Sequence, residues 1–118
     1  PKASRAVGMA NNKNKIIKYS LYLGLNDKDT KTQKIDTLEA YKILCNLLKS
    51  YNVEGFTVYN AHGFYVHDDG TFTIENTLKV ELMFIEEITI DNIIKQLKVI
   101  FNQESIIKQV EEVTSELV

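Results

Sequence analysis

FTVYNAHGFYVHDDGTFTIENTLKVELMFI, residues 56–85, alternates apolar with other residues on both sides of one strong turn signal. The turn signal is Asp-Asp-Gly at 68–70, and it allows two loop lengths. A three-residue loop puts Gly70 in the left-handed conformation and pairs His67 with Thr71. Only that register keeps the apolar residues of both strands on one face, whereas a two-residue loop sets them opposite the polar phase. We therefore expect one long antiparallel hairpin.

Patterned segments flank this hairpin. Residues 16–25 alternate like a half-buried strand, and the polar stretch 26–34 is typical of a surface loop. Asp36 and Glu39 stand at capping-box spacing, which predicts a helix that ends near Tyr51-Asn52. The expected core face of this helix is Leu38, Tyr41, Leu44, Cys45, Leu48 and Tyr51.

The remainder of the chain completes an alternating order of elements. A second helix is expected to start at Thr89 and to stop near Asn102. The tail 105–118 suits either a helix or a strand, and its many β-branched residues favour a strand. The order β-α-β-β-α-β predicts an α+β, ferredoxin-like fold with two helices on one face of an antiparallel sheet.

Composition limits the classes of function. The 118 residues suit one domain, which we place at 16–118, and the net charge of −2 argues against a nucleic-acid polymer or a membrane surface as partner. No apolar run approaches the ~20 residues of a membrane span. A lone Cys45 fits a reducing cytoplasm. Residues 1–8 resemble an expression-tag remnant before Met9, and residues 9–15 are expected to be flexible.

Three polar residues on the apolar phase of the hairpin suggest a binding site. Asn60, His62 and Asn76 share one face with Phe64, and His62 stands opposite Asn76. An unpaired buried polar group costs about 1–3 kcal/mol. Either these groups bond to one another inside the domain, or they line a pocket in which Phe64 stacks on a ring. The sequence leaves both interpretations open.

The loop 26–34 offers a second set of candidates. Lys28, Thr30, Lys31 and Thr32 are suited to a phosphate or to ribose hydroxyls. The alternative is a charged surface loop with no function of this kind. Outside residues 1–8 the chain has no arginine, so lysines, hydroxyls and amides would have to meet any phosphate.

Features of an enzyme are sparse in this sequence. His62 and His67 are an odd number of residues apart, so on a strand they point to opposite faces and do not suit one metal site. The clustered carboxylates show no partner that would shift a pKa, namely those of Glu75, Glu81, Glu86 and Glu87. No familiar catalytic motif occurs. We therefore expect a binding protein rather than an enzyme, with no catalytic residue, no cofactor and no metal.

Three segments carry a resemblance to a known family. YLGLNDKDTKTQ at 22–33, GFTVYNAHGFY at 55–65 and ENTLKVE at 75–81 resemble the phage Thoeris anti-defence sponge family of the first type, over most of the chain. The resemblance implies a phage protein in the host bacterial cytoplasm. It would sequester glycocyclic ADP-ribose without cleaving it and thereby block Thoeris immunity.

The resemblance also implies partners and site residues. Family members assemble as homo-oligomers built of dimers, and some hold cyclic oligonucleotides in separate sites. An aromatic ring and an asparagine of the family site match Phe64 and Asn76, and Lys28 or Lys79 would replace family arginines. The expected ligand-binding set is Phe64, Asn76, His62, Asn60, Tyr65, Lys28 and Thr30. Two alternatives remain open, namely a regulatory domain that acts through a protein partner and a hydrolase of the same nucleotide.

Overall fold

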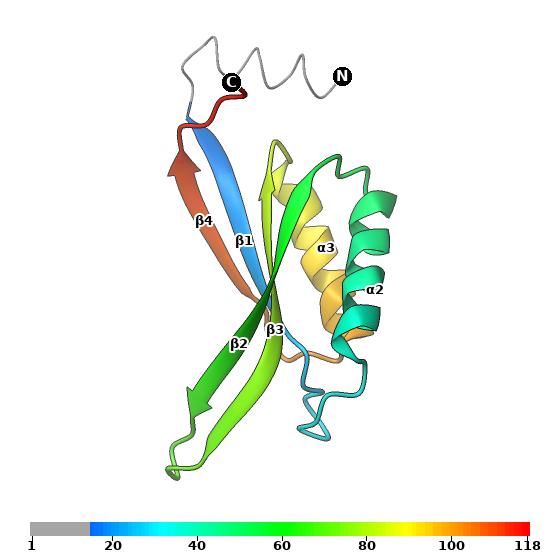
Figure 1. Cartoon of the computed structure of the whole chain (residues 1–118), viewed down its shortest axis with the longest axis vertical. Helices are drawn as coiled ribbons and strands as arrows, with labels where there is room; N and C mark the ends of the chain where they lie inside the picture. The colour runs from blue at the N-terminus through cyan, green and yellow to red at the C-terminus, as the bar shows by residue number, and fades with distance from the viewer. Residues whose placement is uncertain (1–14) are drawn as a thin grey trace.

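The computed structural model describes residues 15–118, which form one antiparallel sheet and two helices (Figure 1). The predictions for 1–8 and for 9–14 lie outside these described residues. The sheet has the order β2-β3-β1-β4, and α2 and α3 cover one of its faces. The element bounds are β1 Ile16–Gly24, α2 Thr37–Ser50, β2 Phe56–Val66, β3 Phe72–Met83, α3 Glu87–Ile100 and β4 Ile107–Val113. The predicted α+β fold is confirmed, including a strand in the C-terminal tail.

The β2–β3 hairpin has the predicted register. The His67 amide donates to the Thr71 carbonyl at 2.8 Å, and Gly70 has a φ of 87°. Phe64 pairs with Ile74, and His62 pairs with Asn76. A non-glycine residue would be strained at that φ, so Gly70 lets the chain reverse within three residues.

The core lies between the helices and one face of the sheet. Alternate residues of β1 and β3 point into it, and residues at helical spacing on α2 and α3 meet them. Core side chains at 0–1% exposure are Leu21, Leu23, Leu78, Val80, Leu82, Ala40, Leu44, Leu48, Ile90, Ile93 and Leu97. This arrangement leaves the other face of the sheet uncovered by helices.

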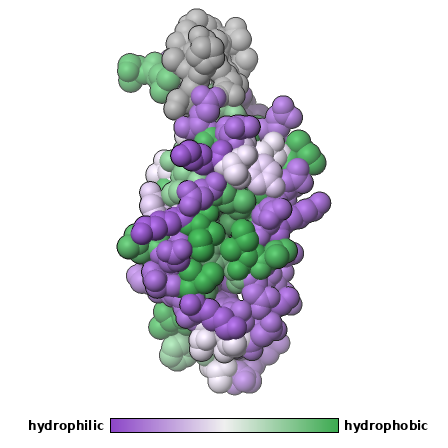
Figure 2. Space-filling view, turned by 90° about the vertical axis from the view of Figure 1, so that its right-hand side faces the viewer, coloured by the Kyte–Doolittle hydropathy of each residue, from purple (hydrophilic) through white to green (hydrophobic). Residues whose placement is uncertain are grey.

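Two details of the helices differ from the prediction. Leu38 and Tyr41 are 63% and 43% exposed, because the buried stripe of α2 runs instead through Ala40, Leu44 and Leu48. Figure 2 looks onto this side and shows apolar residues gathered on the surface. Helix α3 begins at Glu87, earlier than expected, with no side-chain bond at its N-cap.

The distal half of the hairpin extends beyond the helices as an arm, which we define as residues 61–75 (Figure 1). Four apolar side chains of the arm share one face and are 60–68% exposed, namely Phe64, Val66, Phe72 and Ile74. Tyr65 and Glu75 lie on the opposite face, which continues the uncovered face of the sheet. The arm therefore forms a wall beside that uncovered face.

Candidate functional site

A cleft of about 280 Å³ lies on the uncovered face of the sheet, where the arm, β1 and two loops meet. The arm contributes Tyr65, His67 and Glu75, and β1 contributes Tyr22 and Gly24. The loops at 26–31 and 103–105 form the remaining walls. The cleft thus combines residues that are far apart in the sequence.

The floor of the cleft depends on Gly24. A Cβ at this position would stand 2.5 Å from Oε1 of Glu75, so the missing side chain makes room for that carboxylate. Oε2 of Glu75 accepts from the Asn26 amide at 2.9 Å. Glu75 therefore ties the arm to the start of the loop 26–31.

Asp27 shapes the loop itself. Its Oδ1 accepts from the amides of Asp29 and Thr30, both at 2.9 Å, and its Oδ2 accepts from Nδ2 of Asn102 at 2.9 Å. The Thr30 amide first, and then the Asn102 amide group, hold the pKa of Asp27 well below its usual range. Asp27 also forms an ion pair with Lys34 at 3.8 Å, whereas Lys28 and Lys31 form no ion pair with it.

Two lysines of this loop line the cleft. Lys28 and Lys31 are exposed, and neither has an ion-pair partner within residues 15–118. Lys31 has a φ of 61°, which turns the chain sharply at this point. The pair supplies two ammonium groups to an anion, while the nearby carboxylates of Asp27 and Glu75 are held by hydrogen bonds.

Two tyrosines offer rings to the same cleft. Burial first, and then the neighbouring Glu75 carboxylate, raises the pKa of Tyr65. Tyr22 donates from its hydroxyl to Gln109 Oε1 at 3.0 Å, which fixes its ring on the sheet. Aromatic faces beside lysine ammonium groups suit a ligand that has both a flat ring and a phosphate.

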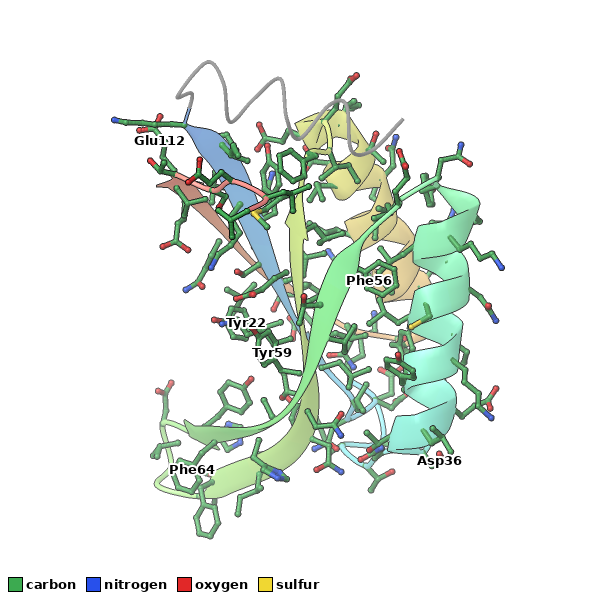
Figure 3. All side chains as sticks on the ribbon, turned by 45° about the horizontal axis from the view of Figure 1, so that its top comes forward. Tyr22, Asp36, Phe56, Tyr59, Phe64 and Glu112 are labelled. Carbon is green, nitrogen blue, oxygen red and sulfur yellow. The ribbon has the colours of Figure 1, made fainter. Side chains whose placement is uncertain are left out.

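A polar cluster adjoins the cleft on the same face of the sheet. Glu81 accepts from Tyr59 at 2.9 Å and lies 3.4 and 3.5 Å from the ammonium nitrogens of Lys18 and Lys79. Lys79 lies 5.5 and 5.4 Å from the ring centres of Tyr22 and Tyr59, which Figure 3 shows side by side. Tyr59 and the lysines lower the pKa of Glu81. The expectation that Glu81 lacks a partner is wrong, because its partners come from three strands.

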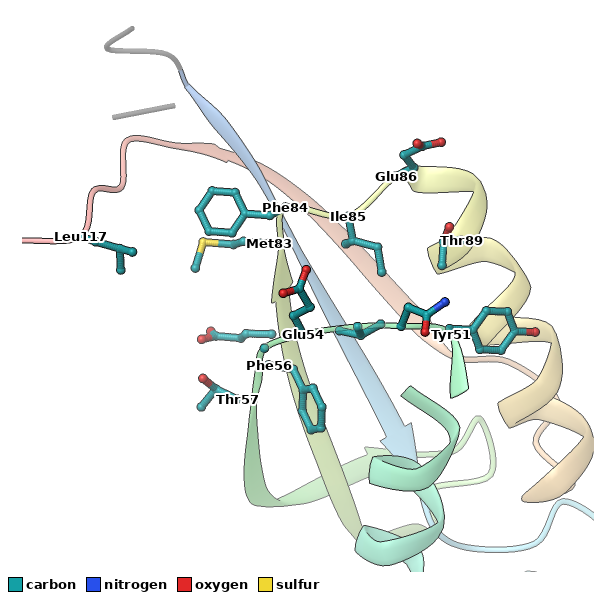
Figure 4. Close-up of a pocket in the computed structure, with 14 residues that line it drawn as sticks. Tyr51, Glu54, Phe56, Thr57, Met83, Phe84, Ile85, Glu86, Thr89 and Leu117 are labelled. Carbon is teal, nitrogen blue, oxygen red and sulfur yellow. The ribbon is translucent and has the colours of Figure 1, made fainter. Parts of the chain in front are cut away.

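A second cavity of about 560 Å³ lies at the other end of the sheet (Figure 4). Phe56 and Thr57 of β2, Met83 and the residues before α3 line it. Its lining includes Glu54, Glu81 and Glu86 but no lysine or arginine. The smaller cleft also contains three carboxylates, those of Asp27, Glu75 and Glu104, but it adds Lys28 and Lys31, so for an anionic ligand we favour the smaller cleft.

The structure separates the sequence-predicted site residues into two groups. Tyr65 and Lys28 line the cleft, and Thr30 lies in its loop, where its hydroxyl stands 3.0 Å from that of Thr32. The other four lie on the opposite face of the hairpin, because even and odd residues of a strand point to opposite sides. These four are Asn60, His62, Phe64 and Asn76.

Each residue of the second group has surroundings of its own. Phe64 stacks on Phe72 with ring centres 5.2 Å apart, and Asn60 and His62 are exposed. Asn76 donates to Oε1 of Gln33 at 2.8 Å and so holds the loop that leads into α2. The sequence did not single out Tyr22, because its role depends on the neighbours that the sheet order brings.

Comparison with known proteins places the chain in a family. The model of a family described as "Protein of unknown function (DUF3574)" matches residues 18–117. No protein of curated function matches the sequence.

Solved structures share the fold. A phage SAM lyase in complex with S-methyl-5'-thioadenosine is 20% identical with a TM-score of 0.65, and the match covers 86% of this chain and 85% of that one. A GlnK–ATP complex of B. subtilis is 16% identical with a TM-score of 0.53, over 84% and 82% of the two chains. At such identities the likeness shows the fold.

The comparison corrects one expectation. The prediction that the chain is not an enzyme is contradicted, because a phage SAM lyase, which is an enzyme, shares this fold at a TM-score of 0.65.

Within residues 15–118 there is no group of three or more side chains suited to a metal ion. None of the helices in that range is long and apolar enough to cross a membrane.

Proposed function

This chain belongs to the DUF3574 family, and we propose that it binds a cyclic ADP-ribose-type immune signal in the cleft of Tyr22, Tyr65, Lys28 and Lys31. The observation that carries the proposal is the placement of two aromatic rings beside two lysines that have no ion-pair partner in residues 15–118. A phage origin and an antagonism of Thoeris immunity follow from the resemblance of residues 22–33, 55–65 and 75–81.

An adenosine-containing ligand fits this cleft chemically. A purine presents a flat face to Tyr22 or Tyr65, and such stacking contributes about 1–3 kcal/mol per base. A diphosphate meets Lys28 and Lys31 as point charges. Two of the solved structures that share the fold hold S-methyl-5'-thioadenosine and ATP, and both of these molecules contain an adenine on a ribose. This shared part of the ligands supports the choice of ligand class.

Calorimetric titration with glycocyclic ADP-ribose and with cyclic ADP-ribose tests the proposal. We expect Tyr65→Ala to weaken binding roughly 5- to 150-fold, the equivalent of one stacked base. Lys28→Ala should weaken it about tenfold, as for one charge-assisted hydrogen bond. Far-UV circular dichroism of each variant checks that the fold is retained.

Phe64→Ala is the matched control, since Phe64 precedes Tyr65 and lies on the opposite face of the hairpin. Full affinity in Phe64→Ala together with loss in Tyr65→Ala supports the cleft. The reverse pattern moves the site to the face of Asn60, His62, Phe64 and Asn76 and contradicts the proposal. Chromatography of the ligand after incubation then reports whether it returns intact or as a product.

A second candidate function is enzymatic turnover of an adenosine-containing substrate. The Glu81 cluster favours this candidate, because the Tyr59 phenol lies 2.9 Å and the Lys79 ammonium group 3.5 Å from the Glu81 carboxylate. Groups of these types can transfer protons. Incubation with S-adenosylmethionine would reveal the activity as formation of S-methyl-5'-thioadenosine. Activity in the wild type and its loss in Glu81→Gln supports this candidate, whereas an unchanged substrate excludes it.

A further inference from the structure

The two outer edges of the sheet differ in how they are protected. Within the described residues, β2 pairs with β3 alone and β4 pairs with β1 alone. The β4 edge is short and carries Lys108, Glu111 and Glu112, which discourage pairing with another chain. The β2 edge is 11 residues long and contains no Lys, Arg, Asp, Glu or Pro. Charged residues and proline, which keep many edge strands single, are thus missing from β2, which lies at the edge of the sheet in Figure 1.

The backbone groups that face this edge can be assigned. The His67 amide donates to Thr71 across the hairpin, so the odd-numbered residues of β2 bond to β3. The even-numbered residues present their N–H and C=O groups to the open edge instead. They are Phe56, Val58, Asn60, His62, Phe64 and Val66.

We propose that two copies of this chain pair along β2, antiparallel, across a twofold axis at Ala61. This register overlaps all of Phe56–Val66 and joins the two sheets into one. Both pairs of helices then lie on the same side of the joined sheet. The inference stands on the edge strand and does not depend on the ligand of the cleft.

The strand is complementary to itself in this register. On the helix side, Asn60 faces His62 of the second copy, and Val58 faces Phe64 of the second copy. Phe56 likewise faces Val66 of the second copy. On this side of the sheet, polar residues thus meet polar residues and apolar residues meet apolar residues. No other overlap of the strand with itself uses all 11 residues.

This pairing accounts for side chains that the single chain leaves exposed. Phe64 and Val66 are 61% and 68% exposed. Phe56 and Val58 lie on the same face of β2 but pack against the core. In the pair, Phe64 and Val66 lie beside Val58 and Phe56 of the second copy, at the margin of its core. Asn60 and His62 gain a polar partner at the centre of the interface. The polar residues on the apolar phase of the hairpin thereby find a role.

The pairing also brings two cavities together. Tyr65 of the cleft stands opposite Thr57 of the second copy, and Thr57 lines the larger cavity. At about 280 Å³ the cleft alone is just below the roughly 300–1,000 Å³ of ordinary ligand sites. In the proposed pair, Thr57 of the second copy lengthens the wall of the cleft beside Tyr65.

Two variants that introduce opposite charges at residue 61 test the proposed twofold axis. Residue 61 faces itself across the axis, so Ala61→Glu and Ala61→Lys each place two like charges about 4.5 Å apart, measured between Cα atoms. Light scattering should give wild type in multiples of two chains of 13.5 kDa. We expect each charged variant alone to lose the pairing, and an equimolar mixture of the two to restore it. Ala61→Ser is the matched uncharged control and should assemble like wild type.

Several outcomes would overturn the proposal. A monomeric or trimeric wild type does so, as does failure of the mixture to restore the mass while circular dichroism shows folded variants. If a charged variant does not fold, Ala61→Cys in a Cys45→Ser background replaces it. Cα atoms about 4.5 Å apart permit a disulfide. Oxidation should then link two chains, and a product that stays a single chain contradicts the register.

Discussion

Asp27 illustrates how a single carboxylate can organise a functional loop. Four donors surround it, two of them backbone amides, and this environment favours the charged form. Lys28 and Lys31 flank its turn and point into the cleft region. The residue that builds the site thus differs from the residues that are expected to touch a ligand.

The depressed pKa of Asp27 predicts how stability depends on pH. Because the folded-state pKa lies below the unfolded value of about 3.9, the stabilisation is fully present above that value and is lost as the pH falls below it. Asp27→Asn should remove this part of the acid sensitivity and lower the stability at neutral pH. Thermal unfolding between pH 2 and pH 7 measures both, and parallel curves for the two proteins would contradict the assignment.

Gly24 gives a prediction that separates stability from binding. In Gly24→Ala the new Cβ displaces the end of the flexible Glu75 side chain, which costs about 1 kcal/mol or less. Glu75 then leaves the Asn26 amide, and the loop with Lys28 loses its tie to the arm. We expect nearly unchanged urea unfolding but weaker binding of glycocyclic ADP-ribose. Large destabilisation with full affinity would show that Glu75 serves the fold alone.

At the scale of elements, the hairpin was predictable and the cleft was not. The turn at 68–70 and the strand alternation determine the register locally, so His62 opposite Asn76 follows from the sequence. The cleft requires the loop at 103–105 to lie beside the arm. That proximity arises from the sheet order, in which β1 separates β3 from β4. No local pattern encodes it, and Tyr22 was missed for this reason.

The helices show the same division between local and global causes. Asp36 caps α2 as its spacing predicts, accepting from the Glu39 amide at 3.0 Å. The periodicity of α2 also predicted Leu38 and Tyr41 in the core. Both lie on the helix surface next to the residues that are buried, namely Ala40, Leu44 and Leu48. The tilt of the helix against the sheet decides between these positions, and only the assembled structure contains it.

Gly70 and Gly55 form a matched pair for the hairpin. A Cβ would meet nothing within 4 Å at either position, but only Gly70 has a positive φ, of 87°. Gly70→Ala should therefore cost about 1–2 kcal/mol of unfolding free energy, all of it from the backbone. Gly55→Ala should cost much less. Urea unfolding compares them, and equal losses would argue against backbone strain as the cause.

At the scale of the whole molecule, the two faces of the sheet have separate tasks. The helix-covered face contains the buried core, and the uncovered face contains the cleft and the Glu81 cluster. Substitutions that weaken the fold and those that weaken binding should therefore map to opposite faces of the same strands.

Leu44 and Leu38 on α2 test the first half of this division. Leu44 is 0% exposed and Leu38 is 63% exposed. Leu44→Ala should cost about 2–5 kcal/mol of unfolding free energy, and Leu38→Ala at most about 0.5 kcal/mol. Chemical denaturation measures both values. Similar costs for the two variants would mean that Leu38 is covered in the assembled protein.

The uncharged edge of β2 bears on how the protein behaves when it is scarce. A solitary copy offers an open template to any extended chain in a crowded cell, including unfinished copies of itself. At low concentration most copies would be monomers with an unpaired β2 edge. At high concentration the proposed pairing would cover that edge. Under the proposed pairing, synthesis that reaches a high concentration early shortens the time for which the β2 edge stays open.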